Sequence, residues 1–169
     1  MKVNKIFSIS LLLGLYFNPI CSQNFDNLHS QLDVLLTNWH DAAAKVNFED
    51  YFDDLLPSSI YIGTDPTELW SKEEFMAYAK PHFKKGKAWS FKKVERNIYY
   101  TSQRDSIAWF DELLQTQMGL CRGSGVLIKK DASWYIQHYV LSIAIPNEHV
   151  SLITKTKKKF DSLYISNKK

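Results

Sequence analysis

The chain has 169 residues, which is enough for one hydrophobic core and too few for two well-formed ones. Hydrophobic residues make up 45% of the chain and charged residues 23%, which is typical of a packed globular fold and excludes a disordered chain. The formal net charge is +3. Residues 1–22, a predicted targeting segment, hold two lysines and no acid, so the rest has 19 basic and 18 acidic residues, a net charge of +1. This balance gives no support for a nucleic-acid-binding protein.

The first 22 residues have the pattern of a signal peptide. Two lysines precede an apolar run at residues 6–17, which is too short to span a bilayer well. We predict cleavage after Ser22 and export to the periplasm or the exterior. A lipoprotein anchored at Cys21 is the disfavoured alternative, because the three residues before it do not resemble a lipobox. Cleavage leaves Cys121 as the single cysteine, so we expect no internal disulfide and a buried, unreactive thiol.

Helical periodicity dominates the first part of the predicted domain, residues 23–150. Residues 24–52 are predicted to be helical with a break near Asn47, because apolar side chains recur there every three or four positions, at Leu28, Leu32, Leu35, Leu36, Trp39 and Ala43. A short strand is expected at residues 60–62. Ser71 followed by Glu74 has the pattern of a capping box and predicts a second helix, ending near Pro81.

From Trp89 onward the apolar residues alternate, which is the period of a β-strand. Four long strands are predicted at residues 89–100, 107–118, 122–129 and 134–145, and their short connections favour an antiparallel meander. The expected fold class is α+β, with helices packed on the concave face of a curved antiparallel sheet around a pocket. Residues 151–169 form a basic tail that could be helical, and a solvated tail is favoured over contact with an anionic membrane surface.

Several short segments, in their order along the chain, resemble one protein family. They are residues 39–44 (WHDAAA), 63–65 (GTD) with 68–70 (ELW), 108–112 (AWFDE), 121–127 (CRGSGVL) and 134–139 (WYIQHY). Together they look like the nuclear transport factor 2-like (NTF2-like) superfamily, in its SnoaL-like bacterial branch, over residues 28–147. The last strand is also similar to the association domain of calcium/calmodulin-dependent kinase.

The resemblance implies a cone-shaped fold, in which a strongly curved sheet wraps over N-terminal helices and leaves an open pocket. It also implies a homodimer that forms through the outer face of the sheet. Members of the superfamily include polyketide cyclases, a ketosteroid isomerase, dehydratases and non-enzymatic binding or assembly domains. The fold alone therefore does not specify the chemistry.

Strand alternation sorts the residues of the last strand onto two faces. One face holds Trp134, Ile136, His138, Val140 and Ser142, and the resemblance implies that this face looks into the cone and places His138 in the pocket. The other face holds Tyr135, Gln137, Tyr139, Leu141 and Ile143. Because this second face is also apolar, we expect it to be the dimer interface.

Strand 107–118 carries two neighbouring carboxylates, Asp111 and Glu112, and alternation points one inward and the other outward. We favour Asp111 as the inward one, because the bulky Trp109 shares its face. An inward Arg122 could then neutralise this carboxylate or bind an anionic ligand through its planar guanidinium group.

The leading interpretation is an exported domain that binds a small organic molecule through Trp39, His40, Tyr61, Trp109, Asp111, Arg122 and His138. The alternatives are a proton-transfer enzyme of the isomerase, dehydratase or cyclase type, with His138 or Asp111 as its base, and a non-catalytic dimeric assembly module. The polar residues could also form a buried network that only orders the core. We predict no cofactor, no nucleic-acid partner, and no metal, because neither HxxxH nor HExxH spacing occurs.

Overall fold

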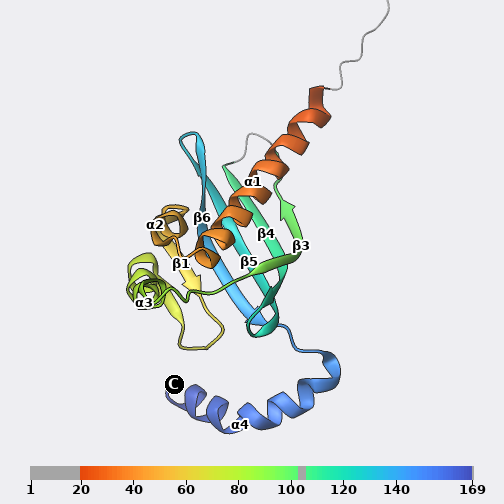
Figure 1. Ribbon diagram of the computed structural model, residues 1–169. Helices are drawn as coiled ribbons and strands as arrows, with labels where there is room; N and C mark the ends of the chain where they lie inside the picture. Colours follow the sequence, from red (N-terminus) through yellow and green to blue (C-terminus); the bar gives the residue numbers. More distant parts are fainter. Residues whose placement is uncertain (1–19, 103–105, 169) are drawn as a thin grey trace, which may run out of the picture.

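The computed structural model describes residues 20–102 and 106–168 (Figure 1). Residues 1–19, which contain most of the predicted signal peptide, lie outside the described residues, so export and the lipoprotein alternative stay predictions. Among the described residues, no helix has both the length and the apolar character needed to cross a membrane.

The helices and strands follow one another in nearly the predicted order. The helices are α1 (Ile20–Ala44), α2 (Phe48–Asp53), α3 (Lys72–Lys84) and α4 (Val150–Ser166), with a 3-10 turn at Asn147–His149. The strands are β1 (Leu55–Ile62), β2 (Leu69–Ser71), β3 (Lys92–Tyr99), β4 (Ile107–Thr116), β5 (Gly119–Lys130) and β6 (Ser133–Ile143). The prediction lacked β2. It also started β1 too late, because the stretch around Pro57 makes the pairing with β6 irregular but does not end the strand.

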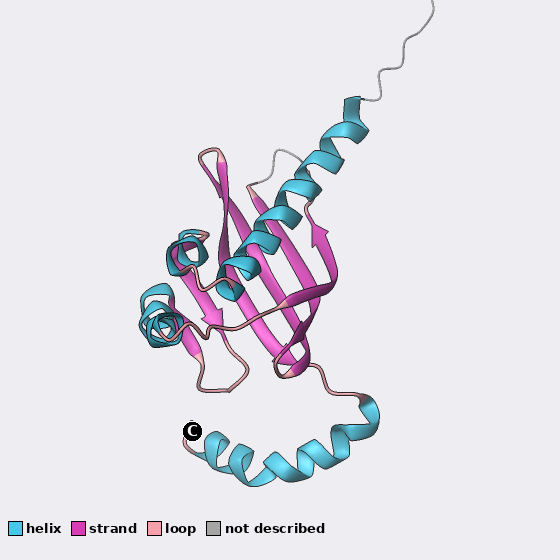
Figure 2. Cartoon of the chain, viewed as in Figure 1, coloured by secondary structure: helices cyan, strands magenta, loops and turns pink. Residues whose placement is uncertain are grey.

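The strands form one sheet in the order β2-β1-β6-β5-β4-β3. Strands β3 to β6 pair antiparallel, as predicted for a meander, and β1 adds to β6 in the parallel direction. Helices α1, α2 and α3 lie on one face of the curved sheet (Figure 2). This arrangement confirms the predicted α+β class. The opposite face of the sheet is called the outer face below.

Large aromatic side chains fill most of the space between these helices and the sheet. The apolar stripe of α1 is buried as predicted, and Leu32, Leu36 and Trp39 have no exposed surface. Helix α3 begins with the predicted capping box, in which the Ser71 hydroxyl accepts from the Glu74 N–H and the Glu74 carboxylate accepts from the Ser71 N–H. The largest buried rings are those of Trp39, Tyr51, Phe52, Phe75, Phe110 and Tyr139, none more than 2% exposed. These side chains therefore fill the deep interior of the cone, between the helices and the sheet.

One irregularity in β6 changes which of its residues face the core. The pairing with β5 skips Gln137, so this residue forms a β-bulge between Ile136 and His138. Because a one-residue shift moves side chains to the opposite face, Ile136 points into the core before the bulge, and Tyr139 and Leu141 do so after it. The predictions that His138 faces the cone and that Tyr139 and Leu141 lie at the dimer interface are therefore wrong. Cys121 is buried, as predicted.

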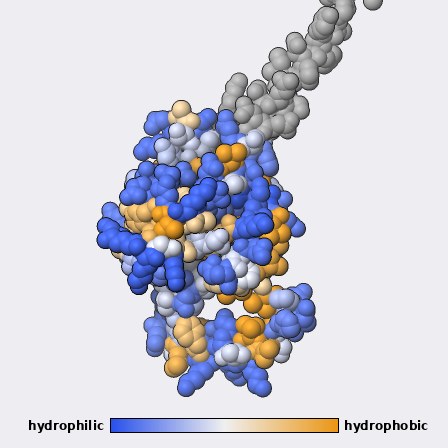
Figure 3. Space-filling model, in the orientation of Figure 1, coloured by the Kyte–Doolittle hydropathy of each residue, from blue (hydrophilic) through white to orange (hydrophobic). Residues whose placement is uncertain are grey.

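The C-terminal helix α4 lies apart from the other helices, beyond one end of the sheet (Figure 1). Apolar side chains gather on its surface (Figure 3), and Leu152, Phe160 and Leu163 are all exposed. One contact returns to the sheet domain, where the Tyr164 hydroxyl donates a 2.7 Å hydrogen bond to the carbonyl oxygen of Pro66. Helix α4 thus touches the loop between β1 and β2, which also borders the cavity described next.

Candidate functional site

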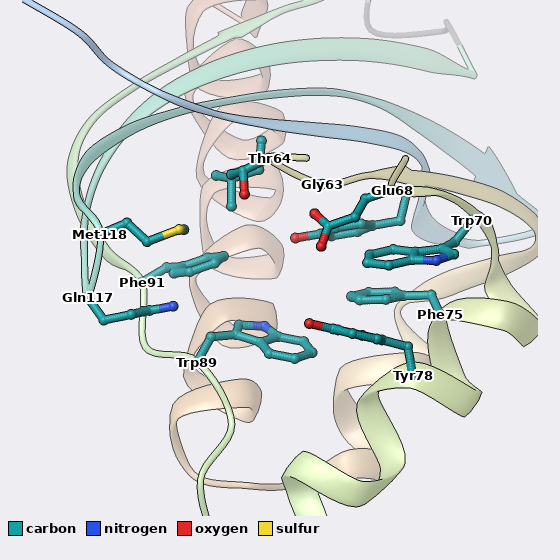
Figure 4. Close-up of a pocket in the computed structure, with 12 residues that line it drawn as sticks. Gly63, Thr64, Glu68, Trp70, Phe75, Tyr78, Trp89, Phe91, Gln117 and Met118 are labelled. Carbon is teal, nitrogen blue, oxygen red and sulfur yellow. The ribbon is translucent and has the colours of Figure 1, made fainter. Parts of the chain in front are cut away.

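A cavity of about 140 Å³ lies among the β1–β2 loop, α3, residues 89–91 and the β4–β5 turn (Figure 4). We call it the mouth cavity. Half of its twelve lining residues are aromatic, namely Tyr61, Trp70, Phe75, Tyr78, Trp89 and Phe91. The others include Glu68 from the β1–β2 loop and Gln117 and Met118 from the β4–β5 turn. The cavity is therefore assembled from segments that are far apart in the sequence.

Several rings around the mouth cavity are nearly parallel. Tyr61 and Phe75 stack with ring centroids 3.9 Å apart and planes 20° apart. The ring of Phe75 is also within 8° of Trp70 and within 18° of Trp89, at centroid distances of 5.5 and 5.6 Å. Because aromatic pairs prefer offset-stacked geometry, such walls suit a flat ligand that continues the stack.

The β1–β2 loop places a carboxylate at the cavity. The Gly63 N–H donates to the Glu68 carbonyl oxygen at 2.9 Å, and the Asp65 carboxylate accepts from the Thr67 N–H at 2.8 Å, which together fold the loop back on itself. Glu68 Oε2 accepts from the Asp65 N–H at 3.1 Å, and the carboxylate lies beside the cavity in Figure 4. A Cβ at position 63 would overlap the Glu68 carboxylate, so a larger residue there would make the Glu68 side chain move.

Tyr61 supplies a hydroxyl to the same cavity. The side chain is only 5% exposed, and its hydroxyl, which is not fully buried, makes no hydrogen bond with any described residue. Burial, followed by the nearby charge of Glu68, raises the pKa of Tyr61 well above its ordinary value, so the hydroxyl keeps its proton at neutral pH. A ligand acceptor could therefore receive a hydrogen bond from Tyr61, while Glu68 can receive one from a ligand donor.

A buried polar network lies between α1 and the sheet, with the carboxylate of Glu112 at its centre. Glu112 Oε1 accepts from His40 Nε2 at 2.7 Å and from the Tyr139 hydroxyl at 2.9 Å, and its Oε2 accepts from Arg96 Nε at 2.8 Å. Arg96 Nη2 is 2.7 Å from the same oxygen, and Arg96 Nη1 donates to the Asp33 carboxylate at 2.9 Å. Burial alone would raise the pKa of Glu112, but His40 and Arg96 outweigh it and hold the pKa below its usual value.

The charge of Glu112 fixes the tautomer of His40. An ionised carboxylate only accepts hydrogen bonds, so His40 Nε2 carries the hydrogen, and Nδ1 has a lone pair when the ring is neutral. This Nδ1 is buried and has no hydrogen-bond partner among the described residues. Phe91 packs edge-on against the His40 ring, with centroids 5.6 Å apart, and also lines the mouth cavity. His40 therefore does not line the mouth cavity, but it lines a separate cavity of about 370 Å³ together with Phe91 and Arg96.

The structure brings only one of the predicted ligand-binding residues to the mouth cavity, which is Tyr61. Trp39 and His40 are buried in the core behind the cavity wall. His138 is half-buried on the outer face, because the bulge turns it away from the core. The predicted convergence of His138 with Asp111 and Arg122 inside the cone does not occur.

The prediction that Asp111 points inward is wrong, and the inward carboxylate is Glu112, which has no exposed surface. Asp111 accepts a 2.9 Å hydrogen bond from the Tyr99 hydroxyl on the outer face. Trp109 gave a misleading signal, because β4 carries bulky rings on both faces and Trp109 stacks on Tyr99 with 44% of its surface exposed. Arg122 does lie near Asp111, with Nη1 3.9 Å from the carboxylate, but this pair is also outside the cone.

Two important side chains were absent from the predicted site. Glu68 belongs to the short ELW segment that carries part of the family resemblance, but its sequence context gives no sign that it borders a cavity. Arg96 could have been found from the sequence, because alternation puts it on the same face of the predicted strand as the apolar Val94 and Ile98. A charged residue on the apolar face of a strand needs a buried partner of opposite charge.

Comparison with known proteins identifies the fold independently. The family model of the SnoaL-like domain matches residues 33–146. An NTF2-like protein of unknown function from Pseudomonas putida KT2440 is similar at 11% identity over 73% of this chain and 91% of its own, with a TM-score of 0.61. A putative scytalone dehydratase from Novosphingobium aromaticivorans DSM 12444 is 8% identical over 73% of this chain and 89% of its own, with a TM-score of 0.60.

A putative dehydratase of the NTF2-like family from Streptomyces avermitilis is also similar in structure. It is 13% identical over 72% of this chain and 99% of its own, with a TM-score of 0.60. Curated protein sequences give no match. These solved structures establish a shared fold, and the family model covers more than half of the chain. The chain therefore belongs to the SnoaL-like family, and it shares the fold of NTF2-like proteins.

Proposed function

We propose that this SnoaL-like domain binds a small organic molecule in the mouth cavity. The observation that carries the proposal is a cavity of about 140 Å³, walled by six aromatic residues and bordered by the unpaired hydroxyl of Tyr61. An apolar protein cavity of about 150 Å³ can hold benzene. The size therefore supports a ligand with a single ring, and a polycyclic molecule would require the walls to move.

Binding without chemistry is supported better than catalysis. The acid–base pair of His40 and Glu112 is separated from the cavity by Phe91, and the Glu112 carboxylate already has four donor atoms around it. A general base has to reach the proton that it removes. Proton transfer of the isomerase or dehydratase type is the second candidate, favoured by the unpartnered Nδ1 of His40. In the mouth cavity it requires Phe91 to move aside, whereas the separate cavity of about 370 Å³ already has His40 in its wall.

The substitution Gln117→Trp tests the binding proposal. Gln117 is exposed in the β4–β5 turn and lines the cavity, so an indole at this position should fill the opening without disturbing the core. We expect single-ring compounds that bind the wild-type protein, detected by ligand-observed NMR from a fragment library, to lose binding to this variant.

Gln115→Trp is the matched control, because Gln115 is exposed on β4 and does not line the cavity. It should bind the same compounds as the wild-type protein. Equal binding by the Gln117→Trp variant would contradict the proposal, as would a library without any ligand. Conversion of a bound compound into a product would favour the enzymatic alternative.

We further propose that two copies associate through the outer face of the sheet. The support is a group of apolar side chains on adjacent strands of this face, which lie around the Asp111–Arg122 pair, at Ile107, Trp109, Leu113, Val126 and Val140. Ile107 and Trp109 are 52% and 44% exposed in the isolated chain. Monomeric proteins rarely expose large contiguous apolar patches, so a second copy is the expected cover.

Trp109→Glu should therefore convert a dimer into a monomer, because it places a charge in the middle of this apolar patch. Size-exclusion chromatography with light scattering measures the mass directly. Val34→Glu, at a residue of α1 with 52% exposure, is the control and should leave the mass unchanged. A monomeric wild-type protein, or a Trp109→Glu variant that stays dimeric, would rule out this interface.

A further inference from the structure

The mouth cavity has one carboxylate in its wall. Glu68 is the only acidic residue among the lining residues, and it is paired with no cation among the described residues. Its Oε2 accepts one hydrogen bond, from the Asp65 N–H, and its Oε1 has no protein partner in the described chain. A half-buried carboxylate next to aromatic rings loses part of its hydration, and a bound positive charge would offset that loss.

The nearby lysines already have other partners. Lys72, at the start of α3, donates a 2.7 Å hydrogen bond to the carbonyl oxygen of Leu55. Lys157 of α4, on the far side of the β1–β2 loop, pairs with Asp161 at 3.4 Å. No described residue therefore pairs with the Glu68 carboxylate, and the cavity that Glu68 lines has room for a ligand that could do so.

The rings of the cavity add a preference for shape. Trp70, Phe75, Tyr78 and Trp89 surround the space that the carboxylate borders (Figure 4), and Tyr61 also lines it. The parallel arrangement of these rings suits a flat ring of the ligand. An anionic ligand would face the carboxylate of Glu68. Charge and shape together therefore select a cationic molecule with an aromatic ring.

We propose that the ligand of the mouth cavity is a compact aromatic amine, bound as a cation with its ammonium group on Glu68 and its ring among the aromatic walls. This inference rests on the proposed binding function and adds the chemical class of the ligand. The Tyr61 hydroxyl, which lacks a partner, would donate to any acceptor atom that the ligand carries.

Three probes with the same ring and different charges test the proposal, namely benzylamine, benzyl alcohol and benzoate. Isothermal titration calorimetry on the whole protein at neutral pH should give affinities in the order benzylamine, benzyl alcohol, benzoate. We expect benzylamine to bind about tenfold or more tightly than benzyl alcohol, as one charge-assisted hydrogen bond would give. Glu68→Gln should remove this advantage, so that benzylamine binds the variant no more tightly than benzyl alcohol does.

The variant is chosen to keep the loop intact, because a glutamine oxygen can still accept from the Asp65 N–H. Glu73→Gln removes the same charge from an exposed position of α3 that does not line the cavity, and it should bind all probes like the wild-type protein. Salt gives a second measurement that needs no variant. Raising the ionic strength should weaken the binding of benzylamine and leave that of benzyl alcohol unaffected.

The possible outcomes separate the two proposals. If benzyl alcohol or benzoate binds as tightly as benzylamine, or if Glu68→Gln and salt have no effect on benzylamine, the cationic class is wrong and the binding function stands. If none of the probes binds and the fragment library also gives no ligand, both proposals fail.

Discussion

Replacing Glu112 by alanine is expected to lower the free energy of unfolding by about 3–5 kcal/mol, the usual cost of removing one partner of a buried ion pair. Arg96 would keep its charge in a site where its side chain is 1% exposed, with only the Asp33 carboxylate, 29% exposed, to balance it. His40 and Tyr139 would each lose the acceptor that they now share. Chemical denaturation followed by circular dichroism measures the change.

The neighbouring residue provides a matched control. Asp111→Ala removes the same chemical group one position earlier in β4, but from the half-exposed outer face, and should cost less than about 1 kcal/mol. The double variant Glu112→Ala with Arg96→Met removes the stranded charge as well, so it should recover part of the lost stability. Equal effects of the Glu112 and Asp111 substitutions would mean that the network does not stabilise the fold.

The same network predicts how stability depends on pH. The pKa of Glu112 lies below its usual value of 4.5 in the folded protein, so the folded state binds its proton less readily than the unfolded state. The stabilising contribution is therefore complete above the usual value and is lost as the pH falls through the lowered folded value. Urea unfolding at a series of acidic pH values should show a steeper loss for the wild-type protein than for Glu112→Ala.

Gly125→Ala is expected to be the second severe substitution, with a loss of about 3 kcal/mol. A Cβ at this position of β5 would overlap the backbone carbonyl oxygen of His138 on β6 and would lie 2.8 Å from two ring carbons of Phe110. A backbone oxygen in the middle of a sheet cannot move aside as a flexible side chain can. The strands would have to separate locally, which weakens the pairing that supports the buried network.

Gly119→Ala separates this collision from the general cost of replacing a glycine. Gly119 has a φ of 84°, which favours glycine, but an added Cβ meets nothing within 4 Å. The substitution there should therefore cost only about 1 kcal/mol. Denaturation curves for the two variants, measured side by side, test the collision. A Gly125→Ala protein that is as stable as Gly119→Ala would show that the sheet accommodates the methyl group.

Apolar periodicity and capping patterns predicted the helices and the meander well, because these elements depend on residues that are close together in the sequence. The apolar stripe of α1 and the capping box at Ser71 are visible in the sequence and are present in the structure. Alternation failed in β6, because a single extra residue at Gln137 reverses every face assignment after it. Nothing in the run of residues around Gln137 marks the bulge.

The candidate site was harder to predict for a different reason. The choice between Asp111 and Glu112 depends on Arg96, which lies on the adjacent strand, and on His40, 72 positions away in the sequence. The mouth cavity likewise joins the β1–β2 loop to the β4–β5 turn, whose residues share no motif. Only the tertiary structure shows that the Glu112 carboxylate is paired with Arg96 and that the Glu68 carboxylate lines a cavity.

The hydrogen bond from Tyr164 to Pro66 links the cavity rim to a helix outside the matched family domain. The family match stops at residue 146, yet the loop that carries Glu68 is held from outside by a side chain 98 positions further along the chain than Pro66. A protein shortened to the family boundary would keep the whole sheet and release one side of that loop. The loop would keep its own hydrogen bonds but would lose the one that reaches it from α4. A ligand would then have to restrict any motion that this loss allows, at a cost in conformational entropy. Helix α4 therefore contacts the rim of the cavity without contributing an atom to its wall.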